Sequence, residues 1–173
     1  MTDQQTTETR DLEAARRGDR AAFARLYEEW YPAVYRYARF NSRTTADAED
    51  LAAEAFARAL AAVSRFRGTA AELPAWLFRI ARNAAIDRAR RTRPTTELVE
   101  LEGGDPTSPL ADRLDIRQAL AQLTQEQRSV ILLRFAAGLS TRETAVAVGR
   151  REKAVESLQH RALEALARRL SPR

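Results

Sequence analysis

Residues 140–163 read STRETAVAVGRREKAVESLQHRAL, and this stretch indicates the fold of the C-terminal part of the chain. Ser140 followed by Glu143 forms a capping box that starts a short helix over residues 141–148. Gly149 ends that helix, because glycine readily takes the left-handed conformation found after helices. A longer helix then runs from about residue 151 to residue 170, with Val155 and Ala162 on its apolar side. A short helix, a glycine turn and a longer basic helix predict a helix-turn-helix.

The segment before the helix-turn-helix carries further helix boundaries. Thr124 with Gln127 forms a second capping box, and Gly138 marks the end of the helix that it starts. Ser108 followed by Pro109 is a favourable N-cap and first-turn pair. We therefore expect a helical C-terminal domain over residues 113–173.

Residues 94–109 read PTTELVELEGGDPTSP, which breaks both helical and strand patterns. Residues 94–112 contain five acidic residues and no basic residue, a net charge of −5. This composition predicts a flexible acidic linker over 94–112. A domain is then expected on each side, at 11–93 and 113–173, with a disordered tail at 1–10.

The N-terminal domain is also predicted to be helical. Asp19 can cap a helix whose apolar positions follow helical spacing. These positions are Phe23, Leu26, Tyr27, Trp30, Val34 and Tyr37. Pro32 lies inside this stripe and predicts a kink or break. Thr44 with Asp47 starts a second helix, and a third follows Pro74. The predicted fold class is all-α, with two small helical domains.

Composition excludes several classes of protein. The 173 residues contain no cysteine and one histidine, which excludes disulfides, thiol catalysis and a paired-histidine metal site. The first ten residues lack the apolar core of a signal peptide, and no apolar run approaches the length of a bilayer span. We expect a cytoplasmic protein without cofactor or metal that does not associate with membranes.

The positive charge is concentrated in two segments. The net charge is +5, and 28 of the 29 basic residues are arginine, which is also what a GC-rich genome favours. Residues 64–93 carry a net +6 and residues 150–173 a net +4, with the acidic linker between them. This distribution predicts two separate contacts with nucleic acid.

Residues 47–56, DAEDLAAEAF, place Asp47, Asp50 and Glu54 on one side of a helix. Two interpretations stay open on the residues alone. Acidic residues are favoured at a helix start by the helix dipole. They can also form an acidic face for a basic protein partner.

Residues 64–68, SRFRG, and 72–91, ELPAWLFRIARNAAIDRARR, combine aromatic residues with many arginines. Phe66 could stack on an unpaired base while the arginines contact phosphates. Asn83 could hydrogen-bond a base edge. Trp76 lies on the apolar stripe of its helix and is expected in the core.

The last predicted helix presents Ser157, His160 and Arg161 on one face. A lone histidine is most often simply exposed or satisfied within the fold, but these neighbours make contact with nucleic acid an equal alternative. The sequence contains no phosphate-binding glycine loop, no H-E-x-x-H motif and no nucleophile elbow. We therefore do not expect an enzyme.

In this order, these segments resemble the extracytoplasmic-function sigma factors of bacterial RNA polymerase, and the resemblance extends from about Leu12 to Leu170. Residues 47–56 look like the segment that binds the clamp helices of the largest polymerase subunit. Residues 64–91 look like the promoter-melting and minus-ten-reading segment. Residues 123–139, LTQEQRSVILLRFAAGL, with the helix-turn-helix after them, look like the minus-thirty-five domain.

The resemblance implies a function and a set of contact residues. It implies a sigma factor that binds core polymerase, through the clamp helices and the flap of the second-largest subunit, and directs promoter-specific initiation. An anti-sigma factor is a candidate further partner. The implied polymerase contacts are Asp47, Asp50, Leu51, Glu54 and Phe56. The implied minus-ten contacts are Phe66, Arg67, Arg79, Arg82, Asn83, Arg88 and Arg90. The implied minus-thirty-five contacts are Arg151, Lys153, Ser157, His160 and Arg161.

Several positions depart from the family pattern. Ala53 stands where glutamine is usual, and the loop from Gly68 to Trp76 is about one residue longer than is common. Glu156 replaces a usual basic residue in the recognition helix. The change at Ala53 implies a clamp contact that depends more on Asp50 and Glu54, and the longer loop implies a different base pocket. The change at Glu156 concerns the minus-thirty-five sequence that is read.

Two other classes of protein were weighed. A stand-alone helix-turn-helix regulator would bind duplex DNA tightly without polymerase, and it would leave residues 47–56 and Phe66 without a role. An enzyme that cuts or joins DNA would need a nucleophile with an activating base, and the sequence offers no such pair.

Overall fold

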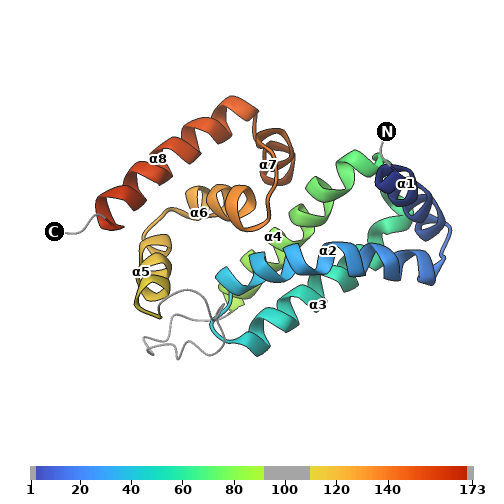
Figure 1. The fold of residues 1–173 in the computed structure, drawn as a ribbon, viewed down its shortest axis with the longest axis horizontal. Helices are drawn as coiled ribbons and strands as arrows, with labels where there is room; N and C mark the ends of the chain where they lie inside the picture. Colours follow the sequence, from blue (N-terminus) through green and yellow to red (C-terminus); the bar gives the residue numbers. More distant parts are fainter. Residues whose placement is uncertain (1–2, 92–109, 171–173) are drawn as a thin grey trace.

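The computed structural model describes residues 3–91 and 110–170 (Figure 1). The N-terminal domain comprises α1 (Asp3–Arg16), α2 (Arg20–Phe40), α3 (Thr45–Ala62), the 3₁₀ turns η1 (Val63–Arg65) and η2 (Ala70–Glu72), and α4 (Leu73–Arg91). The C-terminal domain comprises α5 (Leu110–Ala121), α6 (Gln125–Ile131), the π-helical turn η3 (Leu132–Ala136), α7 (Thr141–Val148) and α8 (Glu152–Leu170). No strand occurs in the two described ranges, and the all-α prediction is confirmed.

The predicted helix starts are confirmed by their caps. The carboxylate of Asp19 accepts hydrogen bonds from the N–H groups of Ala21 and Ala22, at the start of α2. Reciprocal capping boxes start three more helices, because each side chain satisfies a backbone N–H group that the helix leaves unpaired. These pairs are Thr44–Asp47 for α3, Thr124–Gln127 for α6 and Ser140–Glu143 for α7. Gly149 ends α7 with φ of +68°.

The N-terminal segment differs from expectation, because helix α1 begins at Asp3, within the predicted disordered tail. Tertiary contacts hold this helix. Leu12 is buried, and Asp11 accepts hydrogen bonds from Nε and Nη2 of Arg25 at 3.0 and 2.7 Å. The first ten residues have no apolar periodicity, so the pattern gave no sign of a helix that depends on contacts with α2.

Helix α2 also differs from expectation, because it passes through Pro32 without a break. The side chain of Pro32 is exposed, whereas Leu26 and Val34 on either side of it are buried in the core. The missing N–H group therefore lies on the solvent side, where water can satisfy the carbonyl that loses its partner. Packing on the inner side keeps the helix continuous.

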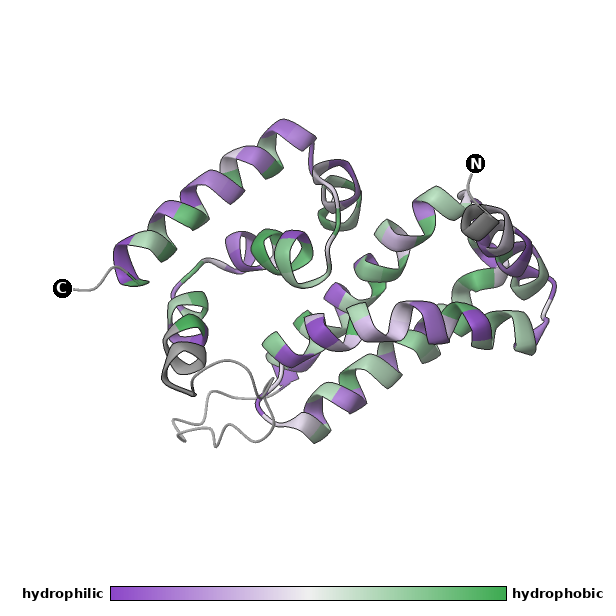
Figure 2. Cartoon of the chain, viewed as in Figure 1, coloured by the Kyte–Doolittle hydropathy of each residue, from purple (hydrophilic) through white to green (hydrophobic). Residues whose placement is uncertain are grey.

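The core forms where the apolar faces of α2, α3 and α4 meet (Figure 2). Tyr37 of α2 packs edge-on against Phe78 of α4, with ring centroids 5.9 Å apart. Both side chains are almost fully buried, and burial raises the pKa of Tyr37 to about 12. The predicted core position of Trp76 is confirmed, since its side chain is buried.

The two domains pack against each other. Helix α7 lies against α4, and η3 lies against α2. The C-terminal end of α2 supplies backbone carbonyl groups as acceptors for arginines of the second domain. Arg117 donates to the carbonyl oxygens of Arg39 and Ser42 at 2.6 and 3.2 Å, and Arg128 donates to that of Phe40. The last carbonyls of a helix have no partner within the helix, so these guanidinium groups cap α2 from the other domain.

The predicted acidic linker 94–112 lies outside the described residues, except for its last three positions. These three belong to α5, which begins at Leu110. Within the described ranges, the structure has no helix that is both long and apolar enough to cross a bilayer.

Candidate polymerase and nucleic-acid interfaces

The acidic segment 47–56 divides into exposed and buried residues. Asp47 closes the capping box of α3, and Asp50 is exposed. Leu51 and Phe56, which we expected to contact polymerase, are 2% and 5% exposed in the domain core. Asp50 is therefore the predicted polymerase contact that is most available to a partner.

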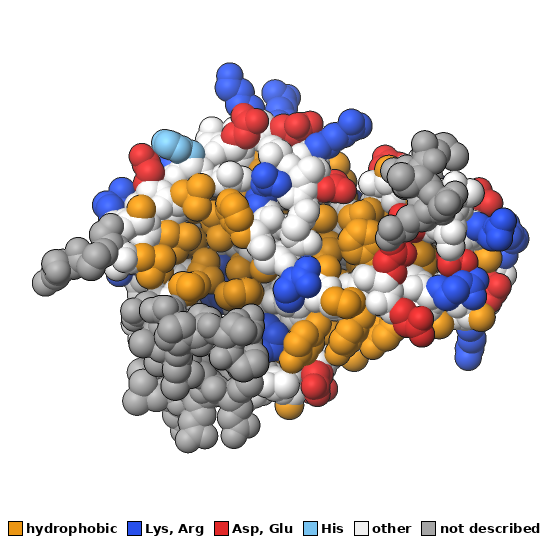
Figure 3. Space-filling model, viewed as in Figure 1, with side chains coloured by type: hydrophobic (Ala, Val, Ile, Leu, Met, Phe, Trp, Pro, Cys, Tyr) orange, Lys and Arg blue, Asp and Glu red, His pale blue; other side chains and the backbone are white. Residues whose placement is uncertain are grey.

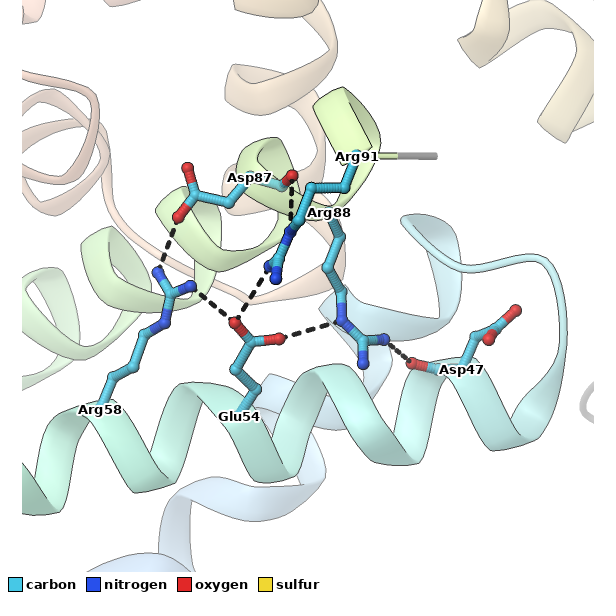
Figure 4. Close-up of polar contacts among 6 residues, drawn as sticks. All are labelled: Asp47, Glu54, Arg58, Asp87, Arg88 and Arg91. Atoms are coloured by element: carbon cyan, nitrogen blue, oxygen red, sulfur yellow. Dashed lines mark hydrogen bonds and ion pairs between the residues drawn. The ribbon is translucent and has the colours of Figure 1, made fainter. Parts of the chain in front are cut away.

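Glu54 faces α4 rather than solvent (Figure 4). Its carboxylate accepts hydrogen bonds from Arg58 at 2.6 Å and from Nε of Arg88 at 3.0 Å, and Arg91 lies 3.5 Å away. Burial alone would raise the pKa of Glu54, but the hydrogen bonds from Arg88 and Arg58 outweigh it and hold the pKa below its usual value. Arg88, a predicted DNA contact, thereby holds α4 to α3.

Three tyrosines on α2 form an aromatic ladder, of which only Tyr27 belonged to the predicted apolar stripe. Tyr27, Tyr31 and Tyr35 follow one another at single-turn spacing, with ring centroids 5.1 and 5.8 Å apart. Phe56 supports the ladder from α3, 4.6 Å from Tyr27. The i, i+4 spacing of three tyrosines was a signal that could have identified this ladder. Hydrophobic side chains over α2 and α3 reach the molecular surface (Figure 3).

The ladder borders the acidic start of α3. Burial raises the pKa of Tyr31, and the nearby charges of Glu49 and the flanking tyrosines raise it further. Glu49 is exposed, as is Asp50. Aromatic and acidic side chains therefore share one surface, which suits a partner that offers apolar and basic groups together.

The predicted minus-ten residues lie on α4 and on the turn between η1 and η2. Phe66 is half-buried, and its ring stacks on Trp76 with centroids 4.7 Å apart. Arg67 is exposed and donates to the carbonyl oxygen of Ser64 at 2.6 Å. Stacking on Trp76 uses part of the ring surface that we expected to receive a base.

The outer face of α4 brings together several predicted DNA contacts. Arg79, Asn83 and Arg90 are exposed, whereas Arg82 is half-buried. Arg82, Asn83 and Arg90 line a polar cleft whose opposite wall includes Glu126 of α6. In this arrangement of the domains, part of the predicted minus-ten surface faces the second domain.

Helix α8 and the residue before it carry the predicted minus-thirty-five residues, at the outer edge of the C-terminal domain (Figure 1, Figure 3). All five are exposed: Arg151, Lys153, Ser157, His160 and Arg161. Their polar contacts stay within the helix. Arg161 donates to the carbonyl oxygen of Ser157 at 3.2 Å, and His160 lies 3.4 Å from Glu164.

The helix-turn-helix is braced by polar contacts from α6 and η3. Arg134 donates to Gln159 of α8 at 3.0 Å and also to the carbonyl of Leu139 before α7. Arg150, in the turn, pairs with Glu126. Val155 and Ala162 are buried and fix the rotation of α8. This rotation turns the predicted reading face outward, as insertion into a major groove requires.

The chain matches known families at both domains. Residues 26–95 match Sigma-70 region 2, and residues 113–166 match Sigma-70 region 4. It is 35% identical over 169 residues to the ECF RNA polymerase sigma factor BldN of Streptomyces coelicolor, covering 92% of this chain and 64% of that relative. It thus spans slightly less than two thirds of that relative. It is 34% identical over 163 residues to SigL of Mycobacterium tuberculosis, covering 90% and 92% of the two chains.

Solved structures agree with these matches. CnrH in complex with the cytosolic domain of CnrY has a TM-score of 0.72 at 27% identity, covering 94% of this chain and 96% of that chain. The sigma factor RpoE of Bartonella quintana, in complex with the anti-sigma factor NepR, has a TM-score of 0.68 at 26% identity, covering 86% and 96%. The chain belongs to the extracytoplasmic-function family of RNA polymerase sigma factors, which direct promoter-specific transcription initiation by binding rather than by catalysis.

Proposed function

We propose that this chain binds core RNA polymerase through the aromatic ladder and the acidic start of α3. The supporting observation is that exposed Glu49 lies near Tyr31 of the ladder, while the next residue on α3, Asp50, is also exposed. Leu51 and Phe56 act in this proposal from within the core, by fixing α3 beneath that surface. The protein would work in the cytoplasm, where core polymerase meets the chromosome.

The same proposal assigns promoter DNA to two other surfaces. On α4, exposed Asn83 would hydrogen-bond a base edge near the minus-ten element while Arg79 and Arg90 contact phosphates. On α8, Arg161, Ser157 and His160 would enter the minus-thirty-five major groove. The free energy of binding to promoter DNA would then offset the free energy needed to unpair it, which is a few kcal/mol per extruded base.

One observation carries the assignment to promoter DNA. The chain has two separate exposed surfaces with arginines, one on α4 and one on α8, and these helices lie in the segments that match Sigma-70 regions 2 and 4. Run-off transcription tests it. The chain together with core polymerase should yield specific transcripts from a promoter library, whereas neither component should do so alone. Tight, specific duplex binding by the isolated chain with no transcript would instead indicate a stand-alone regulator.

Promoter opening tests the minus-ten assignment. Asn83→Ala should leave polymerase binding intact but reduce permanganate-reactive thymines in the minus-ten region. A premelted template should restore only part of the transcript, if Asn83 reads sequence. Wild-type opening by this variant would move the reading role from α4 to the turn 66–75.

We also propose that an anti-sigma protein binds this chain. The support is that RpoE, which resembles this chain over both domains, is seen with the anti-sigma factor NepR. A candidate anti-sigma protein should bind the free chain and reduce the amount that co-elutes with core polymerase. A protein that binds without displacing polymerase would contradict the proposal.

A further inference from the structure

The turn that joins η1 to η2, residues 66–69, lies between two very short 3₁₀ helices. Within the described residues, Arg67 donates to the carbonyls of Ser64 and Phe66 beside it, and Thr69 bonds to Glu72 in a local capping box. Such local bonds shape the turn but do not fix its position against the rest of the domain. That position depends on contacts from other elements.

Arg16, in the last turn of α1, contacts this turn at two points. Its Nη2 donates a hydrogen bond to the carbonyl oxygen of Gly68. Its guanidinium carbon lies over the ring of Phe66, 5.2 Å from the centroid. A guanidinium group suits both contacts, since it is planar, carries five donors and is attracted to aromatic faces.

Phe66 and Gly68 fit together closely beneath this arginine. The Phe66 ring stacks on Trp76, which is buried in α4. A Cβ atom added at Gly68 would lie 2.4 Å from Cζ and 2.7 Å from Cε2 of Phe66. The ring therefore takes this position only because residue 68 has no side chain. Any larger residue would push the ring away from Trp76 or move the turn.

Helix α1 is itself firmly attached to α2. Asp11 is 5% exposed and binds Arg25 through both Nε and Nη2. The indole N–H of Trp30 donates to Glu8 at 3.0 Å. Leu12 and Ala15 are buried on the same side. Through α1, Arg16 therefore holds the turn at a fixed position relative to α2. Arg16 and Gly68 are 52 positions apart in the sequence.

We propose that Arg16 is a positioning residue for promoter opening, which holds the Phe66–Gly68 turn in the orientation that reads the minus-ten element. This inference rests on the proposed minus-ten function and on the minus-ten role that the family resemblance implies for Phe66 and Arg67 in this turn. It extends that role to α1, which lies before residues 26–95 that match Sigma-70 region 2. Arg16 does not itself contact DNA in this scheme. It fixes the residues that do.

Arg16→Ala tests the inference, with Arg17→Ala as the matched control, because Arg17 is the exposed neighbour at the same helix end. Arg16→Ala should slow open-complex formation on duplex promoters by roughly tenfold, the loss expected for one cation–π contact and one charge-assisted hydrogen bond. Binding to core polymerase and the melting temperature of the free chain should stay near those of Arg17→Ala. A premelted template should restore transcription.

A second measurement separates positioning from general stability. Arg16→Ala should also weaken discrimination between the preferred minus-ten sequence and single-base variants of it, which a uniform loss of folded protein would not do. Arg16→Lys keeps the charge but not the planar donor fork, and it should recover part of the rate. Gly68→Ala should reproduce the Arg16→Ala defect by displacing the Phe66 ring, and the double variant should be less than additive.

Three outcomes would overturn the inference. The first is opening and discrimination by Arg16→Ala equal to those of Arg17→Ala. The second is loss of polymerase binding and thermal stability in proportion to opening, which would make Arg16 a structural residue only. The third is full additivity of Arg16→Ala and Gly68→Ala. If the wild-type chain fails to direct initiation at all, the proposed function fails, and that result is distinct from these three.

Discussion

The carboxylate of Glu54 in α3 accepts a hydrogen bond of 3.0 Å from Nε of Arg88 in α4. Arg58 joins the pair by binding both Glu54 and Asp87, at 2.6 and 2.9 Å (Figure 4). Arg88 also donates to the backbone carbonyl of Asp47 at 3.0 Å. This network ties α3, which carries the acidic surface, to α4, which carries the predicted minus-ten residues.

We expect Glu54→Gln to destabilise the N-terminal domain by about 1 kcal/mol, since the carboxylate is partly exposed and such pairs are screened by water. Urea unfolding at neutral pH would measure the change. The control is Glu49→Gln, which replaces an exposed carboxylate on the same helix outside this network. Equal stability of the two variants would show that the network contributes nothing.

The stability contributed by Glu54 should depend on pH. Because its pKa in the folded chain lies below the usual 4.5, its contribution is present in full above the usual value and is lost as the pH falls through the lower folded value. The stability difference between wild type and Glu54→Gln should therefore shrink as the pH drops from about 6 to about 3. A difference that grows on acidification would contradict the direction of this pKa shift.

Asp50→Arg should weaken binding to core polymerase with little change in stability. Asp50 is exposed, so reversal of its charge would repel a basic partner without disturbing packing. Co-elution with core enzyme would measure the effect, and Glu13→Arg provides a control at an exposed acidic residue on α1. Undiminished co-elution of Asp50→Arg would remove the acidic surface from the polymerase assignment.

Arg117→Ala combined with Arg128→Ala should separate the two domains. Each arginine satisfies carbonyl groups at the C-terminal end of α2, so both substitutions leave these groups for water. Small-angle scattering should give the wild type a radius of gyration near the ~16 Å of a compact chain of this length. The double variant should give a larger value, with unchanged helical content. An unchanged radius would mean that the apolar contacts suffice to keep the domains together.

Arg161→Ala should alter promoter preference at the minus-thirty-five element only. Loss of a side chain that reads a base costs about 1–3 kcal/mol at that base and leaves other positions unaffected. Transcription from a promoter library, with Arg169→Ala as the control in the exposed last turn of α8, would separate the two effects. A uniform loss on all promoters would reduce Arg161 to a phosphate contact.

The helices from α2 onward, and their order, could be predicted from the sequence alone, because capping and periodicity are local. Thr44–Asp47, Thr124–Gln127 and Ser140–Glu143 each place a side chain and the N–H group that it satisfies within four residues. The same locality fixed the outward face of α8, since burial of Val155 and Ala162 turns Ser157 and Arg161 to solvent. Family resemblance rested on these same local segments.

Which charged and aromatic residues are available to partners depends on how the helices pack together. Glu54 and Arg88 are 34 positions apart and Arg16 and Gly68 are 52 apart, so no local pattern shows that they bind each other. The helicity of α1 likewise depends on Arg25 and Trp30 of the next helix. A charge read from sequence is available to polymerase or DNA only if the fold has not paired it first. That pairing is set by how the helices pack, not by the residues beside it in the chain.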